Sequence, residues 1–227
     1  MNIKDAKEEY KKTFYLKDDF VLDLMFATVL STHYIHIDSI WLMLIGAPSS
    51  GKTELISAFF KVPFVHHISD LTENTLLSGM NNTVNEPSFL INMGSYGCIL
   101  MKDFTSILGM RKEKRDVILA QLREVYDGEI DKKTGNGKNP SWTGKANFIG
   151  GVTDAIYSFS EEISRMGDRN IHYILPEWDD EDRIKACVVA RKNRQKEGIK
   201  THRLHIQDVF AAYVEELIKT LPVEPPE

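Results

Sequence analysis

The sequence predicts an α/β fold, in which a parallel β-sheet is flanked by helices and followed by a short helical C-terminal segment. Apolar runs of strand length alternate with segments of helical periodicity between residues 38 and 176, an order typical of βαβ units. The first run, residues 39–45 (SIWLMLI), is almost wholly apolar, as is usual for a central parallel strand buried on both faces. We therefore expect a sheet with helices on both sides.

The other elements follow from the same periodicities. Residues 18–34 place apolar side chains at helical spacing behind two aspartates, which predicts an amphipathic helix on one face of the sheet. The turn-rich stretch 131–145 (DKKTGNGKNPSWTGK) predicts a β-hairpin or a long loop between two short strands. Further helices are expected at 53–60 and 112–127, and further strands at 64–68, 95–101, 146–152 and 171–175.

The chain changes character beyond Pro176. An acidic stretch, EWDDED, is followed by two helical segments at about 180–197 and 205–221, without a further strand. The predicted units are an N-terminal helical segment packing on the core (1–37), the core (38–176), a small lid-like helical segment (177–221) and a tail (222–227).

Composition narrows the classes of function. The chain has 227 residues, of which 42% are hydrophobic and 27% charged, as in ordinary globular proteins. No apolar run reaches the roughly 18 residues of a membrane span, and the N-terminus lacks a signal-peptide core, so we expect a cytoplasmic protein without a membrane partner. The two cysteines, Cys98 and Cys187, do not suggest a disulfide framework. A net charge of -5 argues against coating nucleic acid by bulk charge, although a local basic patch stays open.

Residues 46–53, GAPSSGKT, fit the phosphate-binding pattern G-x-x-x-x-G-K-[ST] at every fixed position. The glycines permit a tight turn whose backbone N–H groups point at phosphate oxygens. Lys52 is expected to reach the β- and γ-phosphates and Thr53 to bind Mg²⁺, so ATP and Mg²⁺ are the expected cofactors. The alternative is a glycine-rich turn with an incidental lysine. The candidate binding residues are Gly46, Ala47, Pro48, Ser49, Ser50, Gly51, Lys52 and Thr53.

A site of this kind needs a second acidic group at the tip of a neighbouring strand, to hold the magnesium ion or its water. Asp103 follows the apolar run GCILM at 97–101. We expect Thr53 and Asp103 to be the metal ligands. The alternative is that Asp103 only caps the segment that follows it.

Six segments carry a resemblance to known proteins: WLMLIGAPSSGKTELI, SDLTENTLLSG, ILMKDFTSIL, LREVYDGEIDKKTG, WTGKANFIGGVTDAI and MGDRNIHYIL. Together they resemble a group of ATP-binding proteins, often carried by phages and mobile elements, that is allied to the AAA+ ATPases. The resemblance covers roughly residues 38–176, and the KDFT sequence at 102–105 is typical of that group. More distantly, the order of elements is similar to the minichromosome-maintenance helicases and the bacterial enhancer-binding ATPases.

The resemblance implies a P-loop NTPase fold of the AAA+ type and roles for particular residues. Most hydrolytic AAA+ proteins have a water-orienting glutamate directly after the strand-end aspartate, where this chain has Phe104. Thr105 is a poor base, so we expect slow hydrolysis or a carboxylate from elsewhere. Thr153 falls where the polar first sensor is expected, and a strand-end turn formed with Asp154 is the alternative.

The stretch SRMGDR at 164–169 falls where the resemblance implies an arginine finger that acts on a neighbouring subunit's γ-phosphate. Arg169 matches the pattern better than Arg165. A solvated arginine at a helix end is the alternative. A finger acting in trans implies a homo-oligomer, such as a ring.

The predicted hairpin carries a candidate nucleic-acid surface. In the helicase relatives a hairpin at this position projects into a central pore, where lysines meet phosphates and an aromatic ring can stack on a base. Solvated lysines are the alternative. The candidates are Lys132, Lys133, Lys138 and Lys145, with Trp142. The basic stretch 183–205 is interpreted mainly as a lid helix with a charged exterior and an apolar face formed by Ile184, Val188 and Val189.

The leading hypothesis is therefore an oligomeric AAA+-type ATPase that acts on DNA in phage or mobile-element replication, as a helicase or helicase loader with other replication proteins as partners. One alternative is a scaffold ordered by nucleotide, in which Phe104 marks lost catalysis. The other is a small-molecule P-loop kinase, against which stands the extra hairpin and strand after Asp103.

Overall fold

The structure is a computed structural model, and it describes residues 2–34, 36–78, 88–133, 139–159, 169–196 and 198–222. Five strands form the main sheet: β1 Trp41–Ile45, β2 Val65–Ile68, β3 Tyr96–Met101, β6 Lys145–Val152 and β7 Asn170–Ile174. Two more, β4 Glu129–Asp131 and β5 Ser141–Thr143, form an antiparallel pair. The α-helices are α1 Ile3–Thr13, α2 Phe20–Leu30, α3 Lys52–Ser57, α4 Phe89–Met93, α5 Thr105–Leu108, α6 Lys112–Asp127, α8 Asp180–Lys196 and α9 Ile199–Ile218, and the 3-10 helices are η1 Ser31–His33 and η2 Asp154–Phe159.

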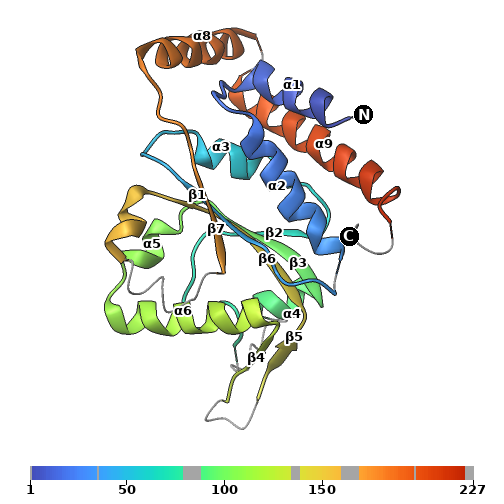
Figure 1. The fold of residues 1–227 in the computed structure, drawn as a ribbon, viewed down its shortest axis with the longest axis vertical. Coiled ribbons are helices and arrows are strands. Elements are labelled where there is room, and N and C mark those ends of the chain that lie inside the picture. The colour runs from blue at the N-terminus through green and yellow to red at the C-terminus, as the bar shows by residue number, and fades with distance from the viewer. Residues whose placement is uncertain are drawn as a thin grey trace.

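The main sheet has the strand order β2-β3-β6-β1-β7, and each neighbouring pair is parallel. Helices cover both of its faces (Figure 1), so the predicted α/β fold with a parallel sheet is confirmed. Every residue of β1 and β6 is buried, as the uninterrupted apolar run in β1 predicts for a central strand. The strand β6 therefore separates β1 from β3.

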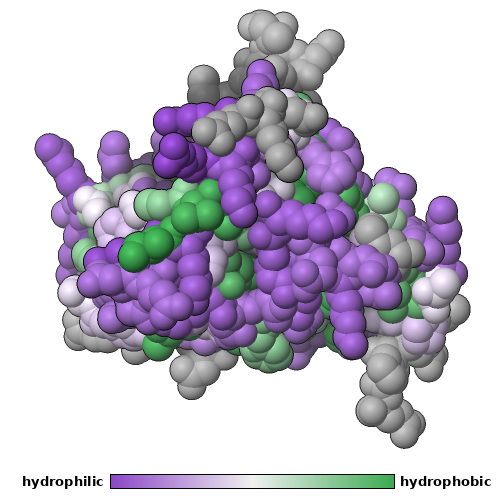
Figure 2. Space-filling model, turned by 90° about the horizontal axis from the view of Figure 1, so that it is seen from above, coloured by the Kyte–Doolittle hydropathy of each residue, from purple (hydrophilic) through white to green (hydrophobic). Residues whose placement is uncertain are grey.

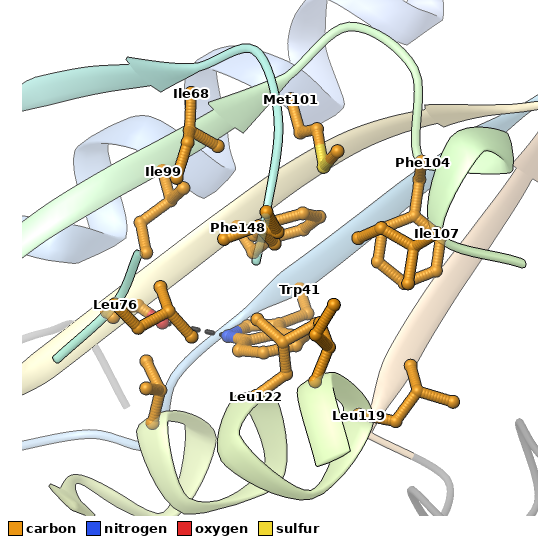
Figure 3. Packing of buried hydrophobic residues seen from close by; sticks show 14 of the residues in the cluster. Trp41, Ile68, Leu76, Ile99, Met101, Phe104, Ile107, Leu119, Leu122 and Phe148 are labelled. Carbon is orange, nitrogen blue, oxygen red and sulfur yellow. Dashed lines mark hydrogen bonds between the residues drawn. The ribbon is translucent and has the colours of Figure 1, made fainter. Parts of the chain in front are cut away.

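One face of the sheet packs against α4, α5, α6 and the β4–β5 hairpin (Figure 1). Trp41 and Phe148 lie at its centre, with ring centroids 5.0 Å apart, and Leu122 of α6 packs toward them (Figure 3). Helix α6 begins and ends where the sequence predicts. Its buried stripe is formed by Ile118, Leu122 and Val125, and Val117, one position outside this stripe, is exposed.

The opposite face packs against α2 and α3, and α1 and α9 lie beyond these helices and extend the same apolar cluster (Figure 1). Phe26 of α2, Phe59 after α3 and Phe210 of α9 form one aromatic cluster with centroids 4.8–4.9 Å apart. The last helix is thus part of the same core as the sheet-covering helices. It begins at Ile199, earlier than the predicted 205, directly after Gly198, whose φ of 80° interrupts the preceding helix.

Helix α8 is held differently from α9. Its side chains Asp182 and Asn193 are buried. Asp182 accepts from Lys17 in the segment that joins α1 to α2, and Asn193 donates to the Thr13 carbonyl at the end of α1. Ile184 and Val188, which were expected to form a packed apolar face, are 64% and 47% exposed. Polar contacts rather than apolar packing therefore attach this helix. None of the helices in the described residues is both long and apolar enough to cross a bilayer.

Candidate functional site

The loops after β1, β3 and β6 meet at one edge of the sheet. These three strands are parallel neighbours, with Ile45 paired to Val152 and Met101 paired to Gly150. Their carboxyl ends must therefore lie side by side, which is where open α/β sheets bind ligands. Loop 46–53, Asp103 and Thr153 follow these ends directly.

Loop 46–53 turns back on itself and encloses the Lys52 side chain. Ser49 and Gly51 have positive φ angles of 66° and 89°, so the backbone makes a turn that a chain of ordinary conformations could not make. The Lys52 ammonium donates to the carbonyl oxygens of Gly46 at 2.6 Å and Ala47 at 2.8 Å. Burial lowers the pKa of Lys52, while the carboxylates of Asp154 and Asp103 act in the opposite direction.

A cavity of about 440 Å³ lies beside this loop and brings the predicted site residues together. Its lining consists of residues 48–54 together with Lys102, Asp103, Thr105 and Thr153. The cavity therefore combines a cation, exposed hydroxyl and carboxylate oxygens, and a loop rich in backbone N–H groups. Such a set suits an anion that carries a divalent cation.

Asp103 and Thr153 are joined through Thr105. The Asp103 carboxylate accepts a bond from the Thr105 backbone N–H at 3.0 Å, and the Thr105 hydroxyl accepts one from the Thr153 backbone N–H at 3.0 Å. The expected capping role of Asp103 and its place in the cavity are thus compatible. Thr105 fixes the separation of the two strand ends.

Phe104 points away from the cavity. Its side chain is fully buried between α5 and the sheet, where its ring meets that of Phe148 with centroids 5.9 Å apart (Figure 3). Its backbone N–H donates to the Gly151 carbonyl at 2.7 Å. A glutamate in this orientation would bury its carboxylate among apolar side chains, rather than place it beside Thr53 and Asp103.

Sequence reasoning missed two acidic residues near the cavity. Asp154, which begins η2, has a larger effect on the pKa of Lys52 than Asp103 has. Glu54 lines the cavity and forms a two-pronged ion pair with Arg203 of α9. Each follows a predicted site residue, Thr153 or Thr53, so adjacency was the available signal.

A second cavity, of about 610 Å³, lies between loop 46–53 and the start of α8. It shares Pro48, Ser49 and Ser50 with the first cavity, so the two are adjacent. Its other lining residues are mostly apolar: Ala47, Leu175, Pro176, Trp178, Ala186 and Cys187, with Glu177 and Arg183. Apolar walls beside a polar pocket suit a ligand with a flat ring and an anionic tail.

Arg169 lies far from both cavities. It directly precedes β7, which runs parallel to β1 with Asn170 paired to Trp41 and Ile174 paired to Ile45. Arg169 therefore lies at the amino ends of the strands, whereas loop 46–53 lies at their carboxyl ends. The strand length implies a separation of about 13 Å or more. The Arg169 guanidinium donates to both oxygens of Asp127 and lies over the Tyr126 ring. Arg165 falls outside the described residues.

The hairpin is present, but three of its nucleic-acid candidates are engaged inside the protein. Trp142 is 5% exposed and its indole N–H donates to the Gly94 carbonyl at 2.6 Å, so no base can stack on it. Lys145 is equally buried, and burial lowers its pKa to about 8. Lys132 is held by the carbonyls of Glu73 and Leu77. The expectation that these three side chains face a polymer is corrected. Lys133 is exposed, and Lys138 lies outside the described residues.

Neither the protein-family models nor the curated proteins include a match to this chain. The fold is an α/β fold with a five-stranded parallel sheet, and it gathers Lys52, Thr53, Asp103 and Thr153 at one edge.

Proposed function

We propose that this chain binds ATP with Mg²⁺ at the edge of the sheet and hydrolyses it slowly, as a P-loop ATPase of the AAA+ type that acts on DNA. One observation carries the proposal. Loop 46–53, Asp103 and Thr153, which the motif and the resemblance single out separately, line the same cavity. A glycine-rich turn with an incidental lysine gives no reason for this arrangement.

The residues present fit this cofactor. The side chains of Thr53 and Asp103 are exposed beside the cavity, so their oxygens are available as magnesium ligands. Bound Mg²⁺ would neutralise charge on the phosphate oxygens. The ammonium of Lys52, which now donates to loop carbonyls, can exchange these weak acceptors for phosphate oxygens. The larger, more apolar cavity suits the adenine ring.

The chain's own groups would position the attacking water poorly. Phe104 is turned into the core and Thr105 is a weak base. We assign the role to Asp154, the carboxylate with the largest effect on the pKa of Lys52. Thr153 lines the cavity, and its hydroxyl could orient the water. Slow basal hydrolysis follows, because Asp154 begins a short 3-10 helix at the end of β6 and is exposed to solvent.

Arg169 supports a role between subunits rather than within one. It lies at the sheet edge opposite to loop 46–53, so it cannot reach the phosphates bound by its own chain. We propose that in a homo-oligomer it approaches a neighbour's nucleotide, after exchanging Asp127 for phosphate. Hydrolysis would then depend on assembly, as in a ring-forming ATPase of phage or mobile-element replication.

A nucleotide-ordered scaffold is a second candidate, and the burial of Phe104 favours it. In this case ATP would bind at the same cavity and order an interface without turnover. Its binding residues would be the same as those of the ATPase.

Binding and hydrolysis of ATP should be measured separately on purified protein, across protein concentration. The variants are Lys52→Ala, Asp103→Asn and Asp154→Asn, with Lys219→Ala as a matched control because Lys219 is exposed after α9. We expect Lys52→Ala to lose binding, and Asp103→Asn and Asp154→Asn to lose turnover while ATP still binds. Binding without turnover in the wild type would favour the scaffold. Unchanged ATP binding by Lys52→Ala would refute the proposed site.

A further inference from the structure

Helix α8 carries a surface that no contact within the described chain explains. Ile184 and Val188 are exposed one helical turn apart, and they line a groove of about 310 Å³ together with Arg183, Cys187 and Arg191. Figure 2 views the molecule from the end where α8 lies, and it shows a small hydrophobic strip within a hydrophilic face. Large apolar side chains held in the open beside cations indicate a docking surface.

The charge of this region is opposite to that of the whole chain. The chain has a net charge of -5, yet its stretch 183–203 contains eight lysines and arginines and one glutamate. The acidic residues of α8 lie in its first turn, where Asp180 pairs with Arg183 and Glu181 with Lys185. Beyond them the helix is basic.

Among the described residues, three exposed cations of α8 have no ion-pair partner. Arg191, Lys192 and Arg194 are exposed, and none of the carboxylates that the structure describes forms an ion pair with them. Two lysines of the hairpin region, Lys132 and Lys145, differ from these cations because their ammonium groups donate to backbone carbonyl oxygens. Exposed cations without carboxylate partners are available to phosphate groups without first breaking an internal ion pair.

We propose that α8 binds single-stranded nucleic acid. Phosphates would pair with Arg191, Lys192 and Arg194, and unstacked bases would lie against Ile184, Val188 and the guanidinium planes that border the groove. Arginine serves both purposes, because it neutralises phosphate and stacks on bases. A duplex would satisfy the cations but leave the apolar strip uncovered, so a single strand fits this surface better.

This surface adjoins the proposed nucleotide site. Arg183 and Cys187 line both the groove on α8 and the cavity beside loop 46–53. A strand bound along α8 would therefore lie next to the bound nucleotide. The inference rests on the proposed action on nucleic acid, but it does not depend on hydrolysis.

The test is fluorescence anisotropy with labelled oligo(dT), oligo(rU) and a duplex, between about 50 and 200 mM salt. The variant combines Arg191→Gln, Lys192→Gln and Arg194→Gln. A matched control combines Lys112→Gln, Lys114→Gln and Lys219→Gln, which removes the same charge from exposed sites elsewhere. We expect the α8 variant to bind single strands about tenfold or more weakly, with a salt slope smaller by about 2, and the control to bind within about twofold of wild type.

Several outcomes would overturn this proposal. Equal losses in the α8 variant and the control would mean that bulk charge is responsible. Loss of binding to anionic phosphatidylserine vesicles, with oligonucleotide binding unchanged, would assign α8 to a membrane surface. If the Lys52→Ala variant, measured without nucleotide, lost oligonucleotide binding, then loop 46–53 rather than α8 would be the oligonucleotide-binding site. If α8 controls strand binding while no ATP binds, only the proposed ATPase fails.

Discussion

The β4–β5 hairpin region and helix α8 both place cations beside apolar side chains, but they use them in opposite ways. Lys145 and Trp142 are buried and donate to backbone carbonyls. On α8 the polar anchors face inward, and Ile184 and Val188 face solvent. The comparison teaches that a stretch rich in basic and apolar residues is a candidate binding surface only when its cations are not hydrogen-bonded to backbone carbonyls inside the protein.

The largest effect on the free energy of unfolding is expected from replacing Trp142, the aromatic residue of the hairpin. Trp142→Ala should lower the free energy of unfolding by about 3–5 kcal/mol, because it leaves a cavity in the core and an unpaired Gly94 carbonyl. Urea unfolding followed by circular dichroism measures this change. Tyr157→Ala is the control, since Tyr157 is 54% exposed, and it should change stability by less than about 0.5 kcal/mol. A loss below about 1 kcal/mol for Trp142→Ala would place the ring at the surface after all.

Lys145 should show the second-largest effect, because it closes the C-terminal end of α2. Its ammonium donates to the carbonyls of Ser31 and Tyr34 at 2.8 and 2.7 Å, and cations stabilise this end of a helix. Lys145→Met should cost about 1–3 kcal/mol by leaving both carbonyls unpaired. Lys133→Met is the matched exposed control.

The same pair of proteins gives a pH test. Burial lowers the pKa of Lys145 from 10.5 to about 8. Between these values the unfolded chain binds the extra proton, so the contribution of Lys145 to stability rises with pH across that window. The stability difference between wild type and Lys145→Met should therefore grow from pH 8 to pH 10.5. A constant difference would mean that the ammonium is solvated.

The contrast between these two regions also shows which features of the structure could be predicted from the sequence. Strand and helix periodicity predicted the sheet, the hairpin and the whole of α6, because local patterns of two and 3.6 residues reflect burial directly. The motif predicted loop 46–53, and strand-end position predicted Asp103 and Thr153, which line the same cavity.

Other features depend on contacts between distant residues, and periodicity does not report these. Lys145 lies under the end of α2 only because β6 inserts between β1 and β3. Asp154 lies near Lys52 for the same reason. The sequence did not predict the exposure of Ile184, because Ile184 and Val188 are spaced as in the buried face of a helix.

Replacing Asp182 should have a smaller effect on stability than replacing Trp142 or Lys145, and the effect should be confined to α8. Bonds from Lys17 and Tyr15 lower the pKa of its carboxyl to about 2. This anchor contributes fully above the ordinary value of 3.8 and is lost as pH falls through about 2. Asp182→Asn should speed hydrogen exchange in α8 at neutral pH and leave α9 unchanged, as measured by mass spectrometry. Equal acceleration in α9 would mean that the two helices open as one unit.

The smallest effect is expected from the apolar strip itself. Ile184 is 64% exposed, so Ile184→Gln should change the free energy of unfolding by less than about 0.5 kcal/mol. A buried isoleucine would cost several times more, because it leaves a cavity or an unpaired polar group. A loss above about 1 kcal/mol in chemical unfolding would therefore show that the chain covers α8 with its own residues, and the difference between α8 and the hairpin would disappear. An unchanged stability with weaker oligonucleotide binding would show that this side chain is kept in the open for a partner.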